Sequence, residues 1–74
     1  MKADWSNLLG EIDVMFRILR FYLPDEDWSW NHPVLRQWMT ERDFKNPYCM
    51  DWDDLVVVLR SLYTKFRKVR RGES

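Results

Sequence analysis

The stretch 51-DWDDLVVVLRSLYTKFRKVR-70 decides the fold class of this chain. Three consecutive valines at positions 56–58 would suit a β-strand, but the segment is far longer than a typical strand. Its apolar residues recur instead with the 3.6-residue period of a helix. They are Trp52, Leu55, Val58, Leu59, Leu62, Phe66 and Val69. We therefore predict a helix over residues 51–70, with Asp51 and Asp54 capping its first turn.

Helical periodicity also marks the N-terminal part of the chain, over residues 4–23. The apolar residues there are Trp5, Leu8, Leu9, Ile12, Met15, Phe16, Leu19, Tyr22 and Leu23. Pro24 ends the pattern, because proline cannot continue a helix. We predict a helix over 4–23, capped by Asp4 or Ser6. Gly10 within it suggests that another backbone approaches closely.

A shorter helix is predicted between these two, over residues 33–42. Pro33 suits its first turn, and Ser29 or Asn31 suits its cap. Its inner stripe is Val34, Leu35, Trp38 and Met39. The following stretch, 44–50, contains the turn signal Asn46-Pro47 and is predicted to be a loop whose aromatic residues, Phe44 and Tyr48, pack against the domain.

The predicted architecture is a single all-α domain over residues 1–74, a small three-helix bundle with helices at 4–23, 33–42 and 51–70. The two long helices are able to pack antiparallel, and Trp38 and Trp52 are expected in the core. The C-terminus at 72–74 is expected to fray.

Composition excludes several classes of protein. The chain has 74 residues, with 12 Lys and Arg against 12 Asp and Glu, one His and one Cys. A single cysteine cannot form an internal disulfide, and one His with one Cys is too few for a zinc site. Every apolar run is much shorter than the roughly 20 residues that span a bilayer, and the N-terminus lacks a signal-peptide pattern. We expect a cytoplasmic protein that does not bind a membrane.

Catalysis is not expected. His32 and Cys49 are the strongest base and nucleophile candidates, but they lie in separate loops without a nucleophile motif. We expect a turn histidine and a semi-buried thiol. The acidic groups at 25–27 and 51–54 suit solvated turns and helix caps. The sequence therefore predicts no enzyme activity, no small-molecule substrate, no cofactor and no metal.

Nucleic-acid binding is the alternative function that the charges support. Between positions 60 and 71 the chain has six basic residues and no acidic one. They are Arg60, Lys65, Arg67, Lys68, Arg70 and Arg71. Such a helix end can follow a phosphate backbone. However, a recognition helix reads bases from its N-terminal residues, and here those are acidic.

The excess of large apolar side chains favours a protein partner instead. Five Trp, four Phe and three Tyr make 16% of the chain aromatic, more than the centre of a small bundle can hold. On the 4–23 helix, Val14, Ile18 and Phe21 form a second apolar stripe beside the core face, bordered by Arg17. Trp28 and Trp30 flank Ser29, next to the acidic turn at 24–27.

We therefore predict a small non-enzymatic protein–protein interaction module, an accessory or inhibitory regulator of the kind that phages and mobile elements encode. Its partner is a larger protein or a second copy of the chain, as a homodimer. The expected contact residues are Val14, Arg17, Ile18, Phe21, Trp28 and Trp30. The plainer alternative is that these aromatic residues are packed within the domain.

Overall fold

The computed structural model describes residues 2–72, with side chains from residue 5 onward, as an all-α protein. Its elements, in chain order, are α1 (Lys2–Tyr22), α2 (Pro33–Glu41), the 3-10 helix η1 (Pro47–Cys49) and α3 (Trp52–Arg70). Residues 2–72 contain no strand. The predicted three-helix bundle is confirmed, with each α-helix boundary within two residues of its expected position.

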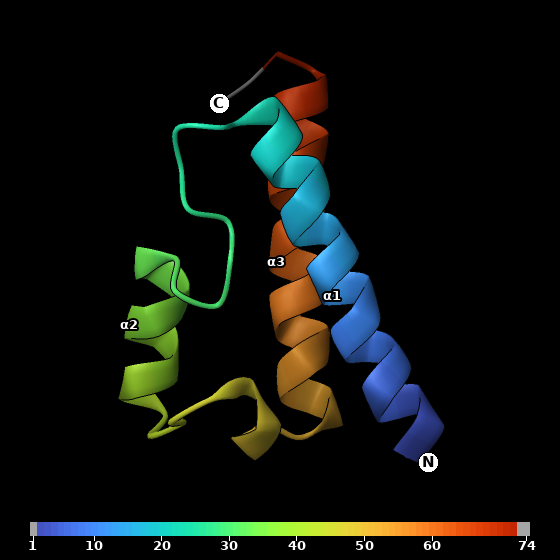
Figure 1. The fold of residues 1–74 in the computed structure, drawn as a ribbon, viewed down its shortest axis with the longest axis vertical. Coiled ribbons are helices and arrows are strands. Elements are labelled where there is room, and N and C mark those ends of the chain that lie inside the picture. Colours follow the sequence, from blue (N-terminus) through green and yellow to red (C-terminus); the bar gives the residue numbers. More distant parts are fainter. Residues whose placement is uncertain (1, 73–74) are drawn as a thin grey trace.

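The two long helices pack against each other and run in the same direction, while α2 runs the opposite way (Figure 1). At one end, the indole Nε1 of Trp5 in α1 donates a hydrogen bond of 2.9 Å to the carbonyl oxygen of Met50, just before α3. At the other end, the rings of Tyr22 and Phe66 lie 5.7 Å apart. The expectation that α1 and α3 pack antiparallel is therefore wrong. The reason is that α2 and the segments beside it carry the chain back along the bundle before α3 begins.

The core contains side chains from all three helices and from both connecting segments. Apolar burial of this kind is the main favourable contribution to folding. The buried residues are Leu8, Ile12, Met15, Phe16 and Leu19 of α1, Leu35 and Met39 of α2, and Leu55, Val58 and Leu62 of α3, with Trp28 and Met50 from the connecting segments. The long helices thus supply most of the core, and α2 covers one side of it.

The N-terminus of α3 has the predicted capping box. Asp51 Oδ1 accepts from the Asp54 amide over 3.0 Å, and Asp54 Oδ2 accepts from the Asp51 amide over 3.3 Å. The N-terminus of α2 is capped differently, by His32, whose Nδ1 accepts from the Val34 amide over 3.3 Å. The prediction of Ser29 or Asn31 as this cap is wrong.

Ser29 and Asn31 instead form a small turn before α2. The Ser29 hydroxyl donates to Asp27 and accepts from the Asn31 amide, so it stabilises the turn and leaves the helix terminus to His32. For α1, the helix begins at Lys2, so Ser6 lies inside it and is not its cap. The side chain of Asp4, the other expected cap, lies outside the described residues.

Helix α2 ends in a Schellman motif that the sequence analysis missed. The Phe44 amide donates to the Met39 carbonyl over 2.8 Å, and the Asp43 amide donates to the Thr40 carbonyl over 3.1 Å. Asp43 occupies the left-handed position with φ +62°, which glycine usually fills. Phe44 is half-buried and packs down as expected, whereas Tyr48 in η1 is 76% exposed, which contradicts the expected packing of that ring.

Three further expectations need correction. Among the described residues, no atom outside α1 lies within 4 Å of the position that a Cβ on Gly10 would take, so no other described backbone approaches it. Trp52 is 50% exposed at the first position of α3, so it is not part of the core. Cys49 is exposed and not semi-buried.

The C-terminus of α3 closes in an ordered turn as far as it is described. Gly72 has φ +80° and its amide donates to the Val69 carbonyl over 3.0 Å, so this residue is hydrogen-bonded and not frayed. Residues 73 and 74 of the expected frayed segment lie outside the described residues. Trp38 of α2, expected in the core, is half-buried and packs against its edge.

Candidate functional site

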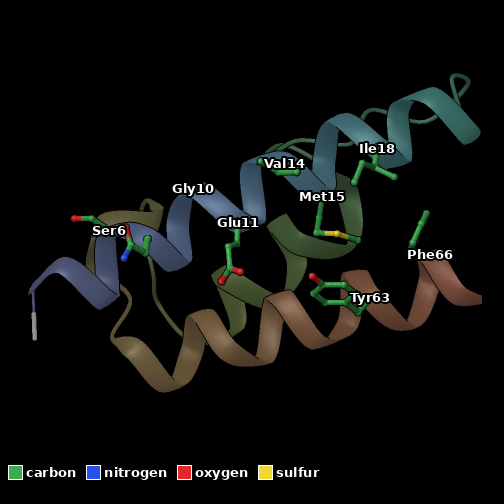
Figure 2. A pocket seen from close by; sticks show the side chains of 9 residues that line it. Ser6, Gly10, Glu11, Val14, Met15, Ile18, Tyr63 and Phe66 are labelled. Carbon is green, nitrogen blue, oxygen red and sulfur yellow. The ribbon is translucent and has the colours of Figure 1, made fainter.

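An open groove of about 950 Å³ runs between α1 and α3. Figure 2 shows α2 behind the two long helices, so the groove opens on the face that α2 leaves uncovered. Its lining residues are Ser6, Asn7, Gly10, Glu11, Val14, Met15 and Ile18 of α1 with Tyr63 and Phe66 of α3. Glu11 is the one charged residue among them, and its side chain extends from α1 toward α3 (Figure 2).

The apolar side of the groove on α1 follows from helical spacing. Val14 and Ile18 are four residues apart and Phe21 follows three residues later, so all three lie on one stripe of α1 beside its core face. Val14 is 49% exposed and Phe21 is 81% exposed. The missing side chain of Gly10, on the same flank, leaves the groove open toward its N-terminal end.

Aromatic rings continue the groove at its other end. The ring of Phe21 packs edge-on against Tyr22 at 5.3 Å, and Tyr22 packs in the same way against Phe66 at 5.7 Å. The guanidinium of Arg70 lies 5.6 Å from the Phe66 ring centre, in a cation–π contact. We call Phe21, Tyr22 and Phe66 the aromatic series.

Charge is ordered along the two helices that form the groove. Among the described side chains of α1 and α3, every acidic residue precedes every basic one. The acidic residues are Glu11 and Asp13 in α1 and Asp53 and Asp54 in α3, and the basic residues are Arg17 and Arg20 in α1 and Arg60, Lys65, Arg67, Lys68 and Arg70 in α3. Because α1 and α3 are parallel, this pair has one acidic end and one basic end.

The acidic end contains one carboxyl with a perturbed pKa. Loss of solvation raises the pKa of Asp54 above its usual value, and the nearby Asp51 carboxylate acts in the same direction. The hydrogen bond from the Asp51 backbone and the charge of Arg42 oppose this rise in the pKa without cancelling it. This end therefore holds its negative charge at some energetic cost.

The structure brings together only some of the residues expected to bind a partner. Val14 and Ile18 line the groove, and Phe21 continues it. Arg17 lies outside the lining, where it forms an exposed ion pair of 3.1 Å with Asp13. An exposed pair of this kind contributes little to stability.

Trp28 and Trp30, which were also expected to contact a partner, pack within the domain instead. Trp28 is 5% exposed and belongs to the core, so it does not lie on the exposed surface of the domain. Its ring stacks on His32 at 4.3 Å, and its carbonyl accepts a 2.8 Å hydrogen bond from Arg20. Trp30 is half-buried, with its ring edge-on to Phe16 at 5.5 Å. Both residues stabilise the segment that connects α1 to α2.

The α3 side of the groove was missed by the sequence analysis. Tyr63 is 41% exposed, and its ring lies in the space between the two helices (Figure 2). Phe66 was assigned to the core stripe, although it lies at the edge of that stripe. The signal was available in the spacing of Tyr63, Phe66 and Arg70, which places the three residues on one face of a helix.

His32 lies at a second, smaller hollow of about 260 Å³ beside Glu26, Trp28 and Lys65. The imidazole is 7% exposed, and both of its nitrogens are engaged. Nδ1 accepts from the Val34 amide, which assigns the proton to Nε2, and Nε2 donates to Glu26 over 3.1 Å. The ring therefore serves as a helix cap. The Trp28 Nε1 is buried and has no hydrogen-bond partner among the described residues.

The basic residues of α3 do not form a single patch. Arg60 and Arg67 border a hollow of about 300 Å³ with Tyr63 and Thr64, and Arg67 borders another, of about 240 Å³, with Arg70 and Arg71. Lys65 lies on a different side of α3, at the His32 hollow. Within the described part of the chain, Arg60, Lys65, Arg67 and Lys68 form no ion pair.

Other kinds of site find little support between residues 2 and 72. That part of the chain has no group of three or more His, Cys, Asp or Glu residues arranged to hold a metal ion. None of its helices combines the length and the apolar composition that a membrane span requires. Comparisons of the chain with protein-family models, with curated proteins and with solved structures gave no match.

Proposed function

We propose that this protein is a non-enzymatic protein–protein interaction module whose groove between α1 and α3 takes up an apolar face of another protein chain. The observation that carries this proposal is the continuity of the exposed groove with the aromatic series. Apolar surface of this extent on a small domain is typical of an interaction site. The groove and the aromatic series occupy the face of the long helices that α2 does not cover.

The dimensions of the groove favour a helical partner. Its lining extends along α1 from Ser6 to Ile18, which corresponds to about 18 Å at 1.5 Å per residue. A helix of three to four turns fits this length, with apolar side chains spaced to enter the groove. Aromatic residues with few rotatable bonds, such as Phe21 and Tyr63, are suited to act as energetic hot spots.

We propose that such a module has an accessory or inhibitory role in the cytoplasm. Binding through the groove would cover a surface of the partner chain or tether it, and no reaction on this chain is needed. The ordered charges at the two ends of the groove would set the orientation and the association rate of the partner.

The test uses a matched pair of substitutions. Val14→Glu places a charge in the groove, whereas Val57→Glu places the same charge on α3 outside the groove lining, and both valines are 49% exposed. The wild-type protein and both variants are used as bait for partner proteins from the source cells, after circular dichroism has confirmed that both variants fold. We expect Val14→Glu to weaken partner binding at least tenfold, about 1.4 kcal/mol, and Val57→Glu to retain it. Equal binding by both variants would overturn the proposal.

A second candidate function is supported by the hollow between Arg60 and Arg67. Arg60 and Arg67 lie on one stripe of α3 with their backbone positions about 10.5 Å apart along the helix axis, and neither residue has an ion pair within residues 5–72. Phosphate groups of a nucleic acid could occupy this hollow. Binding should then weaken steeply with salt and be lost in a double Arg60→Glu and Arg67→Glu variant. Binding that is insensitive to salt would exclude this function.

A further inference from the structure

We infer that the chain that occupies the groove is a second copy of this protein, placed antiparallel to the first across a two-fold axis. This inference rests on the proposed function, because it requires that the groove be a protein-binding surface. It adds the identity of the partner and its orientation.

The charge order of α1 and α3 supports this inference. A partner that lies along the groove must place basic groups near Glu11 and acidic groups near Arg70 to be complementary. The same chain turned end for end has this arrangement, because among the described side chains of both long helices the acidic ones precede the basic ones. The chain has no net charge, so two copies do not repel each other at long range.

The positions of the groove residues define the pairs that would form. Along the groove, Glu11 lies on one side of Met15 and Tyr63, and Phe66 lies on the other (Figure 2). A two-fold axis that lies across the opening of the groove, level with Met15 and Tyr63, brings Glu11 of one copy near Phe66 of the other. The Arg70 guanidinium already lies over that Phe66 ring, at 5.6 Å. Two-fold symmetry makes this contact twice in the dimer.

The parallel packing of α1 and α3 adds a second argument. Two parallel neighbouring helices align their dipoles, which is unfavourable, and an antiparallel pair from a second copy opposes them. A four-helix arrangement of this kind also buries the rings of Tyr63 and Phe21, which the isolated chain exposes. Such burial matters most in a small domain, which by itself buries only about 60% of the surface of the unfolded chain.

The test combines charge reversal with mixing. Sedimentation equilibrium is measured from about 1 μM to about 1 mM for the wild type, Glu11→Arg, Arg70→Glu and an equimolar mixture of these two variants. In the wild type the inference predicts a mass of twice 9.2 kDa, and in each single variant at least a tenfold weaker association. The mixture should regain the dimer, because both contacts of the mixed pair again join opposite charges. Arg36→Glu, an exposed charge reversal on α2, should leave the dimer unchanged.

Two results would overturn the inference. One is a wild-type mass of 9.2 kDa at every concentration, and the other is a failure of the mixture to regain association that the single variants have lost. Neither result decides the proposed function. If the wild type is monomeric while Val14→Glu alone loses another protein partner, the groove remains a binding surface and only its occupant is wrong. If the dimer persists in Val14→Glu and no binding differs from that of Val57→Glu, the proposed function fails as well.

Discussion

The indole N–H of Trp5 donates a hydrogen bond of 2.9 Å to the carbonyl oxygen of Met50, and this bond ties the first turns of α1 to the residue before the cap of α3. The two residues are 45 positions apart in the sequence. Their contact places the N-terminal ends of both long helices at the same end of the bundle. The parallel arrangement, and with it the separation of acidic and basic charge, depends on this end of the structure.

Replacement of Trp5 by Phe should lower the free energy of unfolding by about 1 kcal/mol, because the Met50 carbonyl loses its donor while an aromatic ring is kept. Chemical denaturation of the wild type and the variant measures this difference. Trp52→Phe is the control, since that ring is 50% exposed and its indole N–H donates no hydrogen bond to any of the described residues. We expect the control to change stability by less than about 0.5 kcal/mol. Equal losses in both variants would argue against the role of the Trp5 bond.

Removal of the α2 cap provides a second test. His32→Ala removes the acceptor of the Val34 amide and the partner of Glu26, so we expect a loss of about 1 to 2 kcal/mol in thermal or chemical unfolding. Asn31→Ala, which changes the residue that the sequence suggested as a cap, should cost less than about 0.5 kcal/mol. A larger loss in Asn31→Ala than in His32→Ala would contradict the observed cap.

Replacement of Asp43 by Gly should stabilise the protein. Asp43 has φ +62° at the end of α2, and a left-handed conformation of an L-residue costs about 1 kcal/mol that glycine does not incur. We therefore expect the free energy of unfolding to rise by up to about 1 kcal/mol. Asp43→Ala removes the same negative charge as Asp43→Gly but keeps a Cβ atom at the left-handed position. It should therefore not raise the free energy of unfolding. A lower free energy of unfolding in Asp43→Gly would show that the Asp43 side chain stabilises the protein by more than its left-handed backbone conformation costs.

The perturbed carboxyl of Asp54 predicts a pH dependence. Its pKa is raised in the folded chain, so the folded state binds more protons than the unfolded state as the pH falls through the carboxyl range. Asp54→Asn removes this titration and keeps an oxygen that accepts the Asp51 amide. We expect the wild type to gain stability relative to Asp54→Asn when the pH is lowered from about 7 to about 4. If the difference in free energy of unfolding between the wild type and Asp54→Asn stays constant with pH, or changes in the opposite direction, the result would contradict the raised pKa of Asp54.

Much of the fold could be predicted from the sequence because helices leave periodic signals. The apolar spacing of the two long segments, with Pro24 and Pro33 between them, fixed the number of helices and their limits. Their relative direction was not encoded in that spacing. It follows from the connecting segments, whose buried residues Trp28 and Met50 have no periodic neighbours to mark them.

The helix caps were also predicted only in part from the sequence. Asp51 and Asp54 follow a common capping pattern, so they were predicted correctly. His32 was missed because imidazole is not among the usual capping side chains, and its role depends on a tautomer that Glu26 fixes from six residues away.

Half of the candidate groove was visible in the sequence. The spacing of Val14, Ile18 and Phe21 showed a second apolar stripe on α1, because one helix has room for only one core face. The α3 half was not found, since Phe66 fits the core stripe and Tyr63 lies just outside it. Only the packing of α1 against α3 shows that the two helix flanks form a groove together.

The most direct test of the groove as the interface between two copies of this chain is the solution mass of three proteins at the same concentration, measured by sedimentation equilibrium. We predict that the wild type and Val57→Glu have a mass near twice 9.2 kDa, and that Val14→Glu has a mass near 9.2 kDa. The two substitutions introduce the same charge at valines of equal exposure, so only their positions differ. The same mass for all three proteins would contradict a dimer that forms through the groove.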